Sequence, residues 1–246
     1  MIVFSYGGGV QSIALCVLVR EGILPRPDIV VIADTGREKS TTWRYLHEVA
    51  QPYLDPVGVK IDIASHDLAA KDMYSTGGLP LIPAYTEEGR LPTYCSVEWK
   101  RRVVNRWLRA HGVKECDLWI GFSVDEVNRV SEKDSVKWCR QQFPLIDRMI
   151  NREMCRGIIR NAGLPIPQKS RCFACPHQNE DEWREVQSDA EDWAKAVALD
   201  EEIRANDPEQ KGLYLYSGRV PLAMADFGGK SILPPPKPCD SGFCFT

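Results

Sequence analysis

The sequence MIVFSYGGGVQS at residues 1–12 decides the fold of this chain. Residues 2–5 are apolar or small and predict a buried strand, and the apolar run at 13–19 predicts a helix. Three consecutive glycines therefore occupy a strand-to-helix turn. There, backbone N–H groups and a helix N-terminus can approach an anion without a Cβ in the way. This pattern predicts a phosphate-binding loop built around an anionic nucleotide.

The residues after the glycines exclude the two commonest phosphate-binding motifs. A P-loop has Lys and then Ser or Thr directly after its last glycine, whereas Gly9 is followed by Val10 and Gln11. A dinucleotide fingerprint has glycine at its sixth position, where this chain has Ser12. The remaining pattern is S-x-G-G-G-x-x-S. A glycine-rich turn that serves only close strand–helix packing is the alternative interpretation.

Apolar strands alternate with helical stretches along most of the chain, and this alternation predicts the fold class. We expect strands at residues 2–5, 28–33, 59–64 and 118–122, and helices at 12–21, 40–51, 97–111, 151–161 and 181–205. An irregular segment rich in glycine and proline covers residues 71–93. The pattern predicts an α/β fold with a doubly wound, mostly parallel sheet, followed by a C-terminal cysteine-containing helical extension.

Length and composition indicate a globular protein. The 246 residues are 43% hydrophobic and 26% charged, with a net charge of −3, so no general attraction to nucleic acid is expected. No apolar run reaches membrane-spanning length and the N-terminus lacks signal-peptide features, which predicts a cytoplasmic protein without a membrane partner. We expect a nucleotide-binding α/β domain over residues 1–150 and a helical region with metal-binding cysteines over residues 151–246, packed as one unit.

The cysteines point to metal or redox chemistry. Nine cysteines are an odd and high number for a chain in a reducing compartment, where disulfides are disfavoured. Cys172 and Cys175 form a C-x-x-C motif, followed by Pro176 and His177. This spacing brings two thiolates to one metal site, but alone it does not distinguish zinc, an iron–sulfur cluster and a redox dithiol.

Five motifs occur in an order that resembles the PAPS reductase family, a branch of the PP-loop ATP pyrophosphatases (adenine nucleotide alpha hydrolases). They are the glycine loop, YCSVEWK at 94–100, FPLID at 143–147, NREMC at 151–155 and the C-x-x-C motif. The resemblance covers nearly the whole chain. It implies that the loop holds a phosphate, sulfate or pyrophosphate group of an adenine nucleotide, ATP or (phospho)adenylyl sulfate, through Ser5, Gly7, Gly8, Gly9 and Ser12.

Residues at the ends of later strands are expected beside this loop, because ligands of a doubly wound sheet sit beyond the carboxyl ends of its strands. Asp34 and Thr35 follow the second strand, and the resemblance places this strand end near the adenosine. A turn or capping role is the alternative for Asp34. Gly121 would let the ligand approach the fourth strand, and Arg129 resembles a phosphate-side position of the family.

The resemblance also implies a [4Fe–4S] cluster. Cys95, Cys172 and Cys175 match three cluster ligands of the adenylyl-sulfate reductases, but Ser96 stands where the fourth would be. The fourth ligand must come from elsewhere, and three cysteines are candidates, of which we favour the first: Cys239, Cys244 and Cys155. A zinc site that fixes the tail, or the absence of any metal, are the alternatives to the cluster.

Charged residues at two places have candidate roles. Lys100 lies one helical turn after Cys95, where a cation would lower the pKa of thiolates and stabilise an anionic cluster or a sulfate group. A solvated helix face is the alternative. If the nucleotide is ATP, Asp125 or Glu126 would bind Mg²⁺, although a solvated loop explains both carboxylates as well.

The resemblance implies three functions, of which we favour the first. An ATP-pyrophosphatase-type sulfurtransferase would adenylate its acceptor, a nucleic acid or a small molecule, before sulfur from the cluster, a cysteine or another sulfur donor attacks the activated position. An adenylyl-sulfate or phosphoadenylyl-sulfate reductase would use Cys244 as the nucleophile and a thioredoxin-like reductant. However, the chain ends in CDSGFCFT, in place of the family's E-C-G-L-H tail. The third function is that of a non-catalytic nucleotide or redox sensor.

Overall fold

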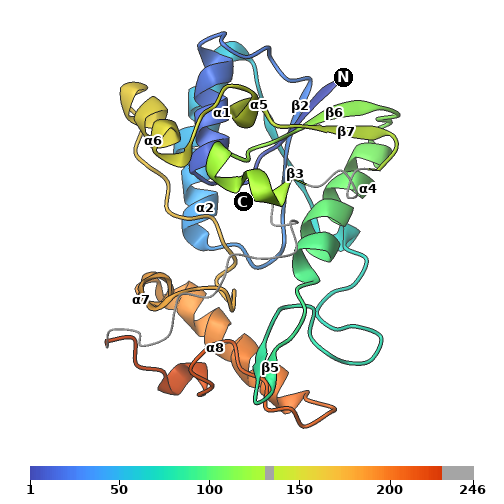
Figure 1. The fold of residues 1–246 in the computed structure, drawn as a ribbon, viewed down its shortest axis with the longest axis vertical. Coiled ribbons are helices and arrows are strands. Elements are labelled where there is room, and N and C mark those ends of the chain that lie inside the picture. The colour runs from blue at the N-terminus through green and yellow to red at the C-terminus, as the bar shows by residue number, and fades with distance from the viewer. Residues whose placement is uncertain (131–135, 229–246) are drawn as a thin grey trace.

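A five-stranded parallel sheet forms the centre of the fold (Figure 1). The computed structural model describes residues 1–130 and 136–228. The strand order is β3-β2-β1-β6-β7, and every pair of neighbours is parallel. The strands are β1 (Ile2–Ser5), β2 (Ile29–Ala33), β3 (Ile61–Ala64), β6 (Cys116–Ile120) and β7 (Cys139–Gln142). The predicted α/β class with a parallel sheet is confirmed.

The central strand β1 is the point at which the strand order reverses. The chain proceeds from β1 to β2 and β3 on one side, and later to β6 and β7 on the other. In open parallel sheets, ligands bind beyond the carboxyl ends of the strands at such a switch point. Ser5 pairs with Val31 of β2 and with Ile120 of β6, so the residues that follow these three strands meet at one edge of the sheet.

Alternating side chains of the strands pack against helices on both faces of the sheet. Phe4 and Ile32 share a buried cluster with α1 (Val10–Arg20) and α6 (Arg152–Asn161). Val3 and Val31 share another with α4 (Arg102–Ala110). Burial of these two apolar layers is the main favourable term in folding. The shorter helical segments here are α2 (Ser40–Tyr45), α3 (Gln51–Leu54), α5 (Pro144–Asp147) and the 3₁₀ turns Asp55–Val57, His66–Leu68 and Val124–Arg129.

Two of the expected helices contain a π-helical turn. In the stretch expected at 40–51 this turn is Leu46–Ala50, and in the stretch expected at 97–111 it is Ser96–Arg101. Such turns are frequent at functional sites, and the second one directly follows Cys95. The sequence pattern did not predict β7, because its residues Cys-Arg-Gln-Gln are mostly polar and lie at the edge of the sheet.

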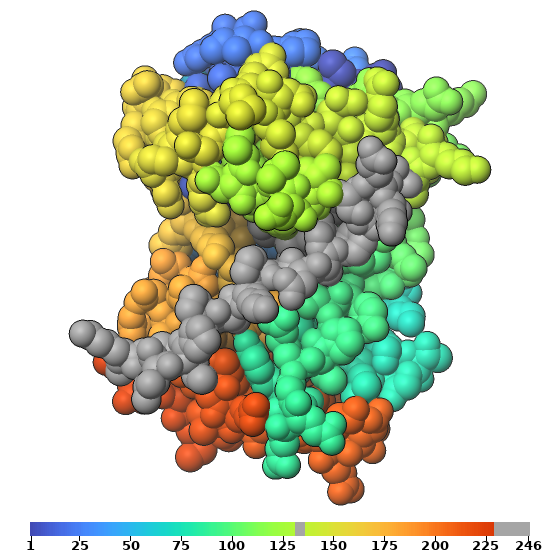
Figure 2. All heavy atoms as spheres, in the orientation of Figure 1, coloured from blue at the N-terminus to red at the C-terminus, as the bar shows by residue number. Residues whose placement is uncertain are grey.

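A second hydrophobic core joins two distant parts of the chain. It combines apolar residues from 73–99 with apolar residues from 173–227, and Figure 2 shows these segments together at the end of the molecule away from the N-terminal residues. The elements here are β4 (Tyr85–Thr86), β5 (Gly89–Arg90), α7 (Glu180–Gln187), α8 (Ala190–Ala205) and the 3₁₀ turn Leu222–Met224. Helix α6, which follows residue 150, packs with α1 in the sheet core. A domain boundary at residue 150 stays a prediction. In the described part of the chain, no helix has the length and apolar character needed to cross a membrane.

The prediction of a single helix over 181–205 is wrong. The chain forms two helices, α7 and α8, with a break at residues 188–189. Asp189 causes the break, because its carboxylate accepts hydrogen bonds from the backbone N–H groups of Glu191 (3.2 Å) and Asp192 (3.1 Å) and so caps a new helix. A capping box between Asn179 and Glu182 opens the first helix in the same way.

Asp200 on α8 ties the last part of the described chain to the second core. Its fully buried carboxylate accepts backbone hydrogen bonds from Leu215 (3.0 Å) and Leu222 (2.9 Å). We expect Asp200→Ala to lower the free energy of unfolding by about 3 kcal/mol or more, because each buried N–H that loses its acceptor costs about 1–3 kcal/mol. Urea unfolding measures this loss. Glu201→Ala, at an exposed position of the same helix, is the control and should stay within about 0.5 kcal/mol; equal losses would contradict the assignment.

Candidate nucleotide and cysteine site

The glycine loop connects β1 to α1 at the switch point of the sheet. Ser12, on the first turn of α1, accepts a hydrogen bond from the Gly7 N–H (2.9 Å), and Ser170 donates to the Gly7 carbonyl (2.6 Å). Gly9 is the N-cap residue of α1, and no side chain of the described residues caps this helix. Its first-turn N–H groups and the positive end of its dipole therefore remain available to an anion.

Gly8 is a glycine for steric reasons, whereas Gly121 makes only ordinary contacts beside the loop. Gly8 has φ +74°, and a Cβ built on it would lie 2.8 Å from Cγ2 of Thr42, closer than real side chains approach. A Cβ on Gly121, directly after β6, would lie 3.5 Å from the backbone nitrogen of Ser12. Gly121 thus lies against the first turn of α1. This is the strand end at which the sequence predicts that the ligand comes close.

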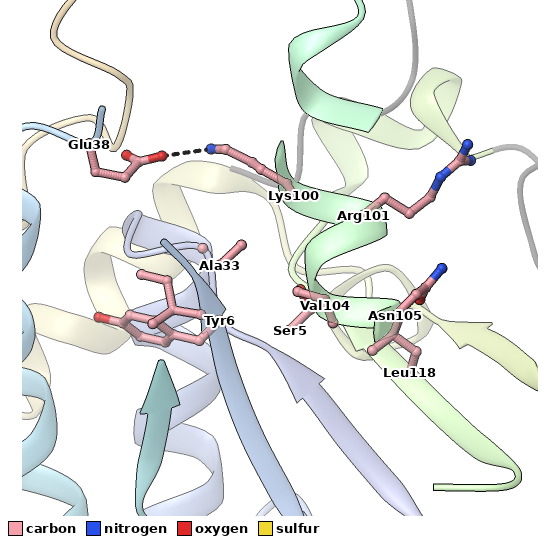
Figure 3. A pocket seen from close by; sticks show the side chains of 11 residues that line it. Ser5, Tyr6, Ala33, Glu38, Lys100, Arg101, Val104, Asn105 and Leu118 are labelled. Carbon is pink, nitrogen blue, oxygen red and sulfur yellow. Dashed lines mark ion pairs between the residues drawn. The ribbon is translucent and has the colours of Figure 1, made fainter. Parts of the chain in front are cut away.

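A small cavity lies beside the glycine loop, between the strand ends and the segment that leads into α4 (Figure 3). Ser5, Gly7 and Ala33 line it together with Glu38 and Lys100. The Lys100 Nζ lies 3.0 Å from Glu38 Oε1, and both side chains are largely buried. The structure therefore brings Lys100 to the loop and pairs it with a carboxylate that sequence reasoning missed.

Asp34 and Thr35 take different positions at the end of β2. The Asp34 carboxylate accepts a hydrogen bond from the Gly36 N–H (2.7 Å), which is the turn role named as its alternative. Thr35 is fully buried, and its hydroxyl lies 3.7 Å from the Cys172 sulfur. Thr35 therefore belongs to the surroundings of the C-x-x-C motif, and an adenosine contact of either residue stays a prediction.

Cys95, Cys172 and Cys175 line a single cavity of about 170 Å³, hereafter the cysteine cavity. The first cysteine comes from the turn before α4 and the other two from the loop before α7, so the fold brings together residues that are far apart in the sequence. Lys100 lines both this cavity and the cavity beside the glycine loop. Lys100 is thus the one lining residue that the two cavities share within the described part of the chain.

Backbone hydrogen bonds hold the C-x-x-C loop against the connection from β2 to α2. The Phe173 N–H donates to the Arg37 carbonyl (2.9 Å), and the Lys39 N–H donates to the Arg171 carbonyl (3.2 Å). Together with the bond from Ser170 to the glycine loop, these contacts fix the position of the cysteines relative to the predicted phosphate site.

The cysteine cavity has donor groups suited to an iron–sulfur cluster. Besides three thiols it holds Ser96, which is 2% exposed and whose hydroxyl has no hydrogen-bond partner among the described residues. In the same residues, no three His, Cys, Asp or Glu side chains are grouped so that they could hold one metal ion. Cluster thiolates bind different iron atoms, so they need not converge on one point. Burial, and then the Glu38 carboxylate, raises the pKa of the Cys172 thiol to about 12, so metal binding has to displace this proton.

The candidates for a fourth ligand are divided between core and tail. Cys239 and Cys244 lie outside the described residues. Cys155 is fully buried in the cluster formed by α6 and α1, and burial raises the pKa of its thiol to about 12. Cys155 does not line the cysteine cavity. Ligation by Cys239 stays a prediction.

The turn after β6 carries the predicted phosphate-side residue. Arg129 lines the cysteine cavity and forms an ion pair with Glu126. Glu126 also accepts a hydrogen bond from Gln11 of α1 (2.7 Å), which attaches this turn to the helix after the glycine loop. Asp125 accepts the Arg152 backbone N–H (2.5 Å). Both carboxylates expected for Mg²⁺ therefore have protein partners, and magnesium binding stays a prediction.

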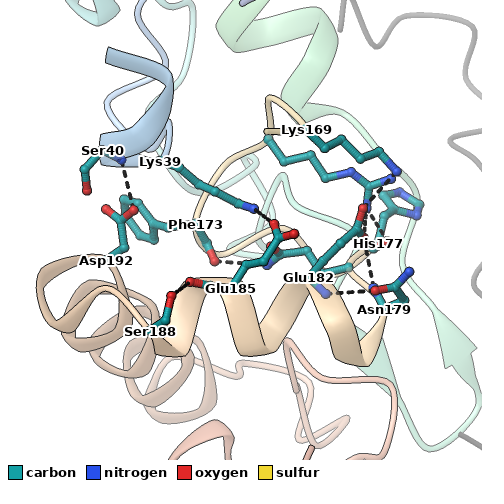
Figure 4. A network of polar contacts seen from close by, with 12 residues as sticks. Lys39, Ser40, Lys169, Phe173, His177, Asn179, Glu182, Glu185, Ser188 and Asp192 are labelled. Carbon is teal, nitrogen blue, oxygen red and sulfur yellow. Dashed lines mark hydrogen bonds and ion pairs between the residues drawn. The ribbon is translucent and has the colours of Figure 1, made fainter. Parts of the chain in front are cut away.

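Three cations, Arg152, Lys169 and Arg171, line the cysteine cavity and are called the basic wall below. Figure 4 shows the network behind it. Lys169 and Arg171 both pair with Glu182, at 2.9 and 3.0 Å, and the Asn179 N–H donates to the same carboxylate (3.0 Å). Burial, and then the neighbouring Arg171 cation, lowers the pKa of Lys169.

Glu182 should make folding stability depend on pH. Burial raises its pKa, but Arg171, Lys169 and the Asn179 N–H outweigh burial, so the pKa lies below the ordinary 4.5. The carboxylate therefore stabilises the fold above pH 4.5, and this contribution is lost as the pH falls through the lower folded-state pKa. We expect Glu182→Gln to flatten the fall in unfolding free energy between about pH 5 and 3 in urea titrations. An unchanged slope would contradict this role.

His177 is a further lining residue, and it follows the C-x-x-C motif directly. Arg90 donates to its Nδ1 (3.0 Å), so Nε2 carries the proton and faces the Thr93 hydroxyl (3.4 Å). Both ring nitrogens of His177 thus face protein groups in this structure. Glu38, Ser170 and Lys169 were also missed by sequence reasoning. Ser170 had one signal, its position two residues before Cys172.

Fold and site together define an α/β protein with a glycine loop at the switch point of its sheet and an adjoining cysteine-lined cavity. Among solved structures, the chain is similar to the U34-tRNA thiolase NcsA from Methanococcus maripaludis with its [4Fe–4S] cluster. The identity is 14% and the TM-score 0.48, over 85% of this chain and 67% of that chain. No protein-family model and no curated protein sequence matches the chain.

Proposed function

We propose that this chain is an adenine-nucleotide-dependent sulfurtransferase of the PP-loop type, related to the PAPS reductase family. The observation that supports it most is the shared position of Lys100, which lines both the cavity beside the glycine loop and the cysteine cavity. A nucleotide phosphate on the loop and sulfur chemistry at the cysteines would then be neighbours. That proximity is what a transfer from one to the other requires.

In this proposal each group of residues has one task. The glycine loop, with Ser5 and Ser12, binds the phosphates of ATP, and Gly121 allows the nucleotide to approach the end of β6. The acceptor attacks the α-phosphate, pyrophosphate leaves, and sulfur then displaces AMP from the acceptor. Lys100, held by Glu38, supplies positive charge between the two cavities, where it stabilises the anionic groups on either side.

The cysteine cavity would hold the cofactor. Cys95, Cys172 and Cys175 are the ligands that the described residues offer, and Cys239 is the proposed fourth. A [4Fe–4S] cluster bound there, with its irons held by these thiolates, would supply or bind the sulfur for the transfer. The cations around the cavity would stabilise the negative charge of such a cluster.

Product analysis tests this function against its alternatives. The anaerobically purified protein is given either ATP or PAPS, together with reductant, thioredoxin and total RNA or DNA as acceptor, and pyrophosphate and sulfite are measured separately. Release of pyrophosphate from ATP that depends on the acceptor supports the proposal. Sulfite from PAPS would instead establish a reductase, and nucleotide binding without either product would argue against a nucleic-acid acceptor and favour the sensor.

A further inference from the structure

Within the described residues, more cations line the cysteine cavity than there are carboxylates paired with them. Five cations line it: Lys100, Arg129, Arg152, Lys169 and Arg171. Three carboxylates pair with four of these cations, namely Glu38, Glu126 and a shared Glu182. The Arg152 guanidinium forms no ion pair within residues 1–130 and 136–228, where Asp125 bonds only its backbone N–H. The basic wall could therefore bind an anionic ligand.

The fold assembles this charge from separate segments. Arg129 comes from the turn after β6, Arg152 is the first residue of α6, and Lys169 and Arg171 precede the C-x-x-C motif. Like charges brought together out of water repel one another. The single carboxylate of Glu182 serves two of these cations and a backbone N–H at once. A phosphate group is the natural compensating ligand, because guanidinium and ammonium groups bind it strongly.

An exposed aromatic residue lies next in sequence to residues of the same cavity. Tyr94 stands between Thr93 and Cys95, both of which line the cavity, and Tyr94 is 52% exposed. Aromatic rings beside a cationic groove are platforms on which unpaired bases stack. The cysteines line a cavity and not an open surface, so a group inside a double helix would have to leave the stack to reach them.

We propose that the basic wall and Tyr94 bind a single-stranded nucleic acid, with phosphates on Arg152 and Lys169 and a base on the ring of Tyr94. The strand would present its acceptor group to the cysteine cavity. This inference rests on the proposed function in naming the strand as sulfur acceptor, whereas the binding itself requires neither adenine nucleotide nor turnover.

Fluorescence anisotropy of the full chain with labelled oligonucleotides tests the proposal. Single-stranded RNA and DNA of one mixed sequence and the corresponding duplex are compared. We expect Arg152→Gln and Lys169→Gln each to weaken single-strand binding about three- to tenfold and to lower the salt-dependence slope by about 0.7. Tyr94→Ala should weaken it about tenfold with little change in the slope. Lys60 directly precedes β3, and its side chain is 81% exposed. Lys60→Gln therefore removes the same charge at a different place and should leave single-strand binding unchanged.

Three binding results would overturn the proposal: no binding of the single strand, tighter binding of the duplex, or an equal loss of binding in Lys60→Gln. A fourth would be Arg152→Gln and Lys169→Gln variants that no longer hold iron or bind inorganic pyrophosphate but still bind the oligonucleotide as the wild type does. In the last case the wall serves the cluster or a small anion. A preference for RNA or for DNA supports the proposal and identifies the strand. A wild-type chain that binds the strand but no adenine nucleotide would refute the proposed function alone.

Discussion

The Cys172→Ala variant, purified without oxygen, should contain no iron above background and transfer no sulfur. Cys172 is held in place on several sides, since its sulfur is near Thr35 (3.7 Å) and Glu38 (3.9 Å) and its loop is hydrogen-bonded to the β2–α2 connection. Changes that only surround a metal site cost about 10–100-fold in affinity or activity. Loss of a ligand itself should therefore lower turnover by more than about 100-fold.

The matched control for this variant is Cys155→Ala. Cys155 is also a buried thiol with a raised pKa, but it packs between α6 and α1 and lies outside the cysteine cavity. We expect this variant to keep its iron and to lose about 1 kcal/mol of unfolding free energy, the usual effect of removing one heavy atom from a packed core. Iron and activity measured side by side decide the matter. Iron loss in Cys155→Ala with retention in Cys172→Ala would reverse the ligand assignment.

The Gly8→Ala variant should lose adenine-nucleotide binding by at least about tenfold, a difference of about 1.4 kcal/mol. The added Cβ must be accommodated at φ +74° and 2.8 Å from Cγ2 of Thr42, so either the loop or α2 has to move. Because the loop N–H groups bind through their exact placement, a shift of a few tenths of an ångström is enough to weaken them. Equilibrium binding of ATP, with thermal unfolding measured in parallel, gives the result.

Two further variants separate the close contact from backbone strain. Gly112 has φ +78°, and nothing lies within 4 Å of a Cβ built on it. Gly112→Ala should therefore show the same left-handed backbone penalty, about 1–2 kcal/mol of stability, with unchanged ATP binding. Thr42→Ser removes the methyl group that the new Cβ would strike, so the Gly8→Ala/Thr42→Ser double variant should recover part of the lost affinity. Equal binding losses in Gly8→Ala and Gly112→Ala would contradict the proposed loop.

The sequence was most informative where local pattern and function coincide. The glycine loop needs a strand before it and a helix after it, and both can be read directly from residues 1–19. The parallel sheet followed from the alternation of strands and helices along most of the chain, whereas the position of the loop at the switch point is known only from the structure. The placement of Cys95 with the distant Cys172 and Cys175 followed only from the family resemblance. The structure brings these three residues to one cavity, while their role as ligands remains to be tested.

Other features depend on tertiary contacts and could not be predicted locally. Glu38 gains its importance from Lys100 on a different element. Lys169 and Arg171 matter because both meet the same carboxylate, that of Glu182. The irregular segment at 71–93 has little regular periodicity, yet it forms a core with residues from 173–227. The break between α7 and α8 was missed because a capping Asp189 looks like any other acidic residue in a long polar helix.

The metal content of the anaerobically purified full chain tests the central claim most directly, since both the cofactor and the sulfur chemistry depend on the cysteine cavity. Iron, zinc and acid-labile sulfide are measured on the same sample. A [4Fe–4S] cluster predicts about four iron and about four sulfide per chain, with little zinc. A colourless protein that contains zinc, or no metal at all, would contradict it.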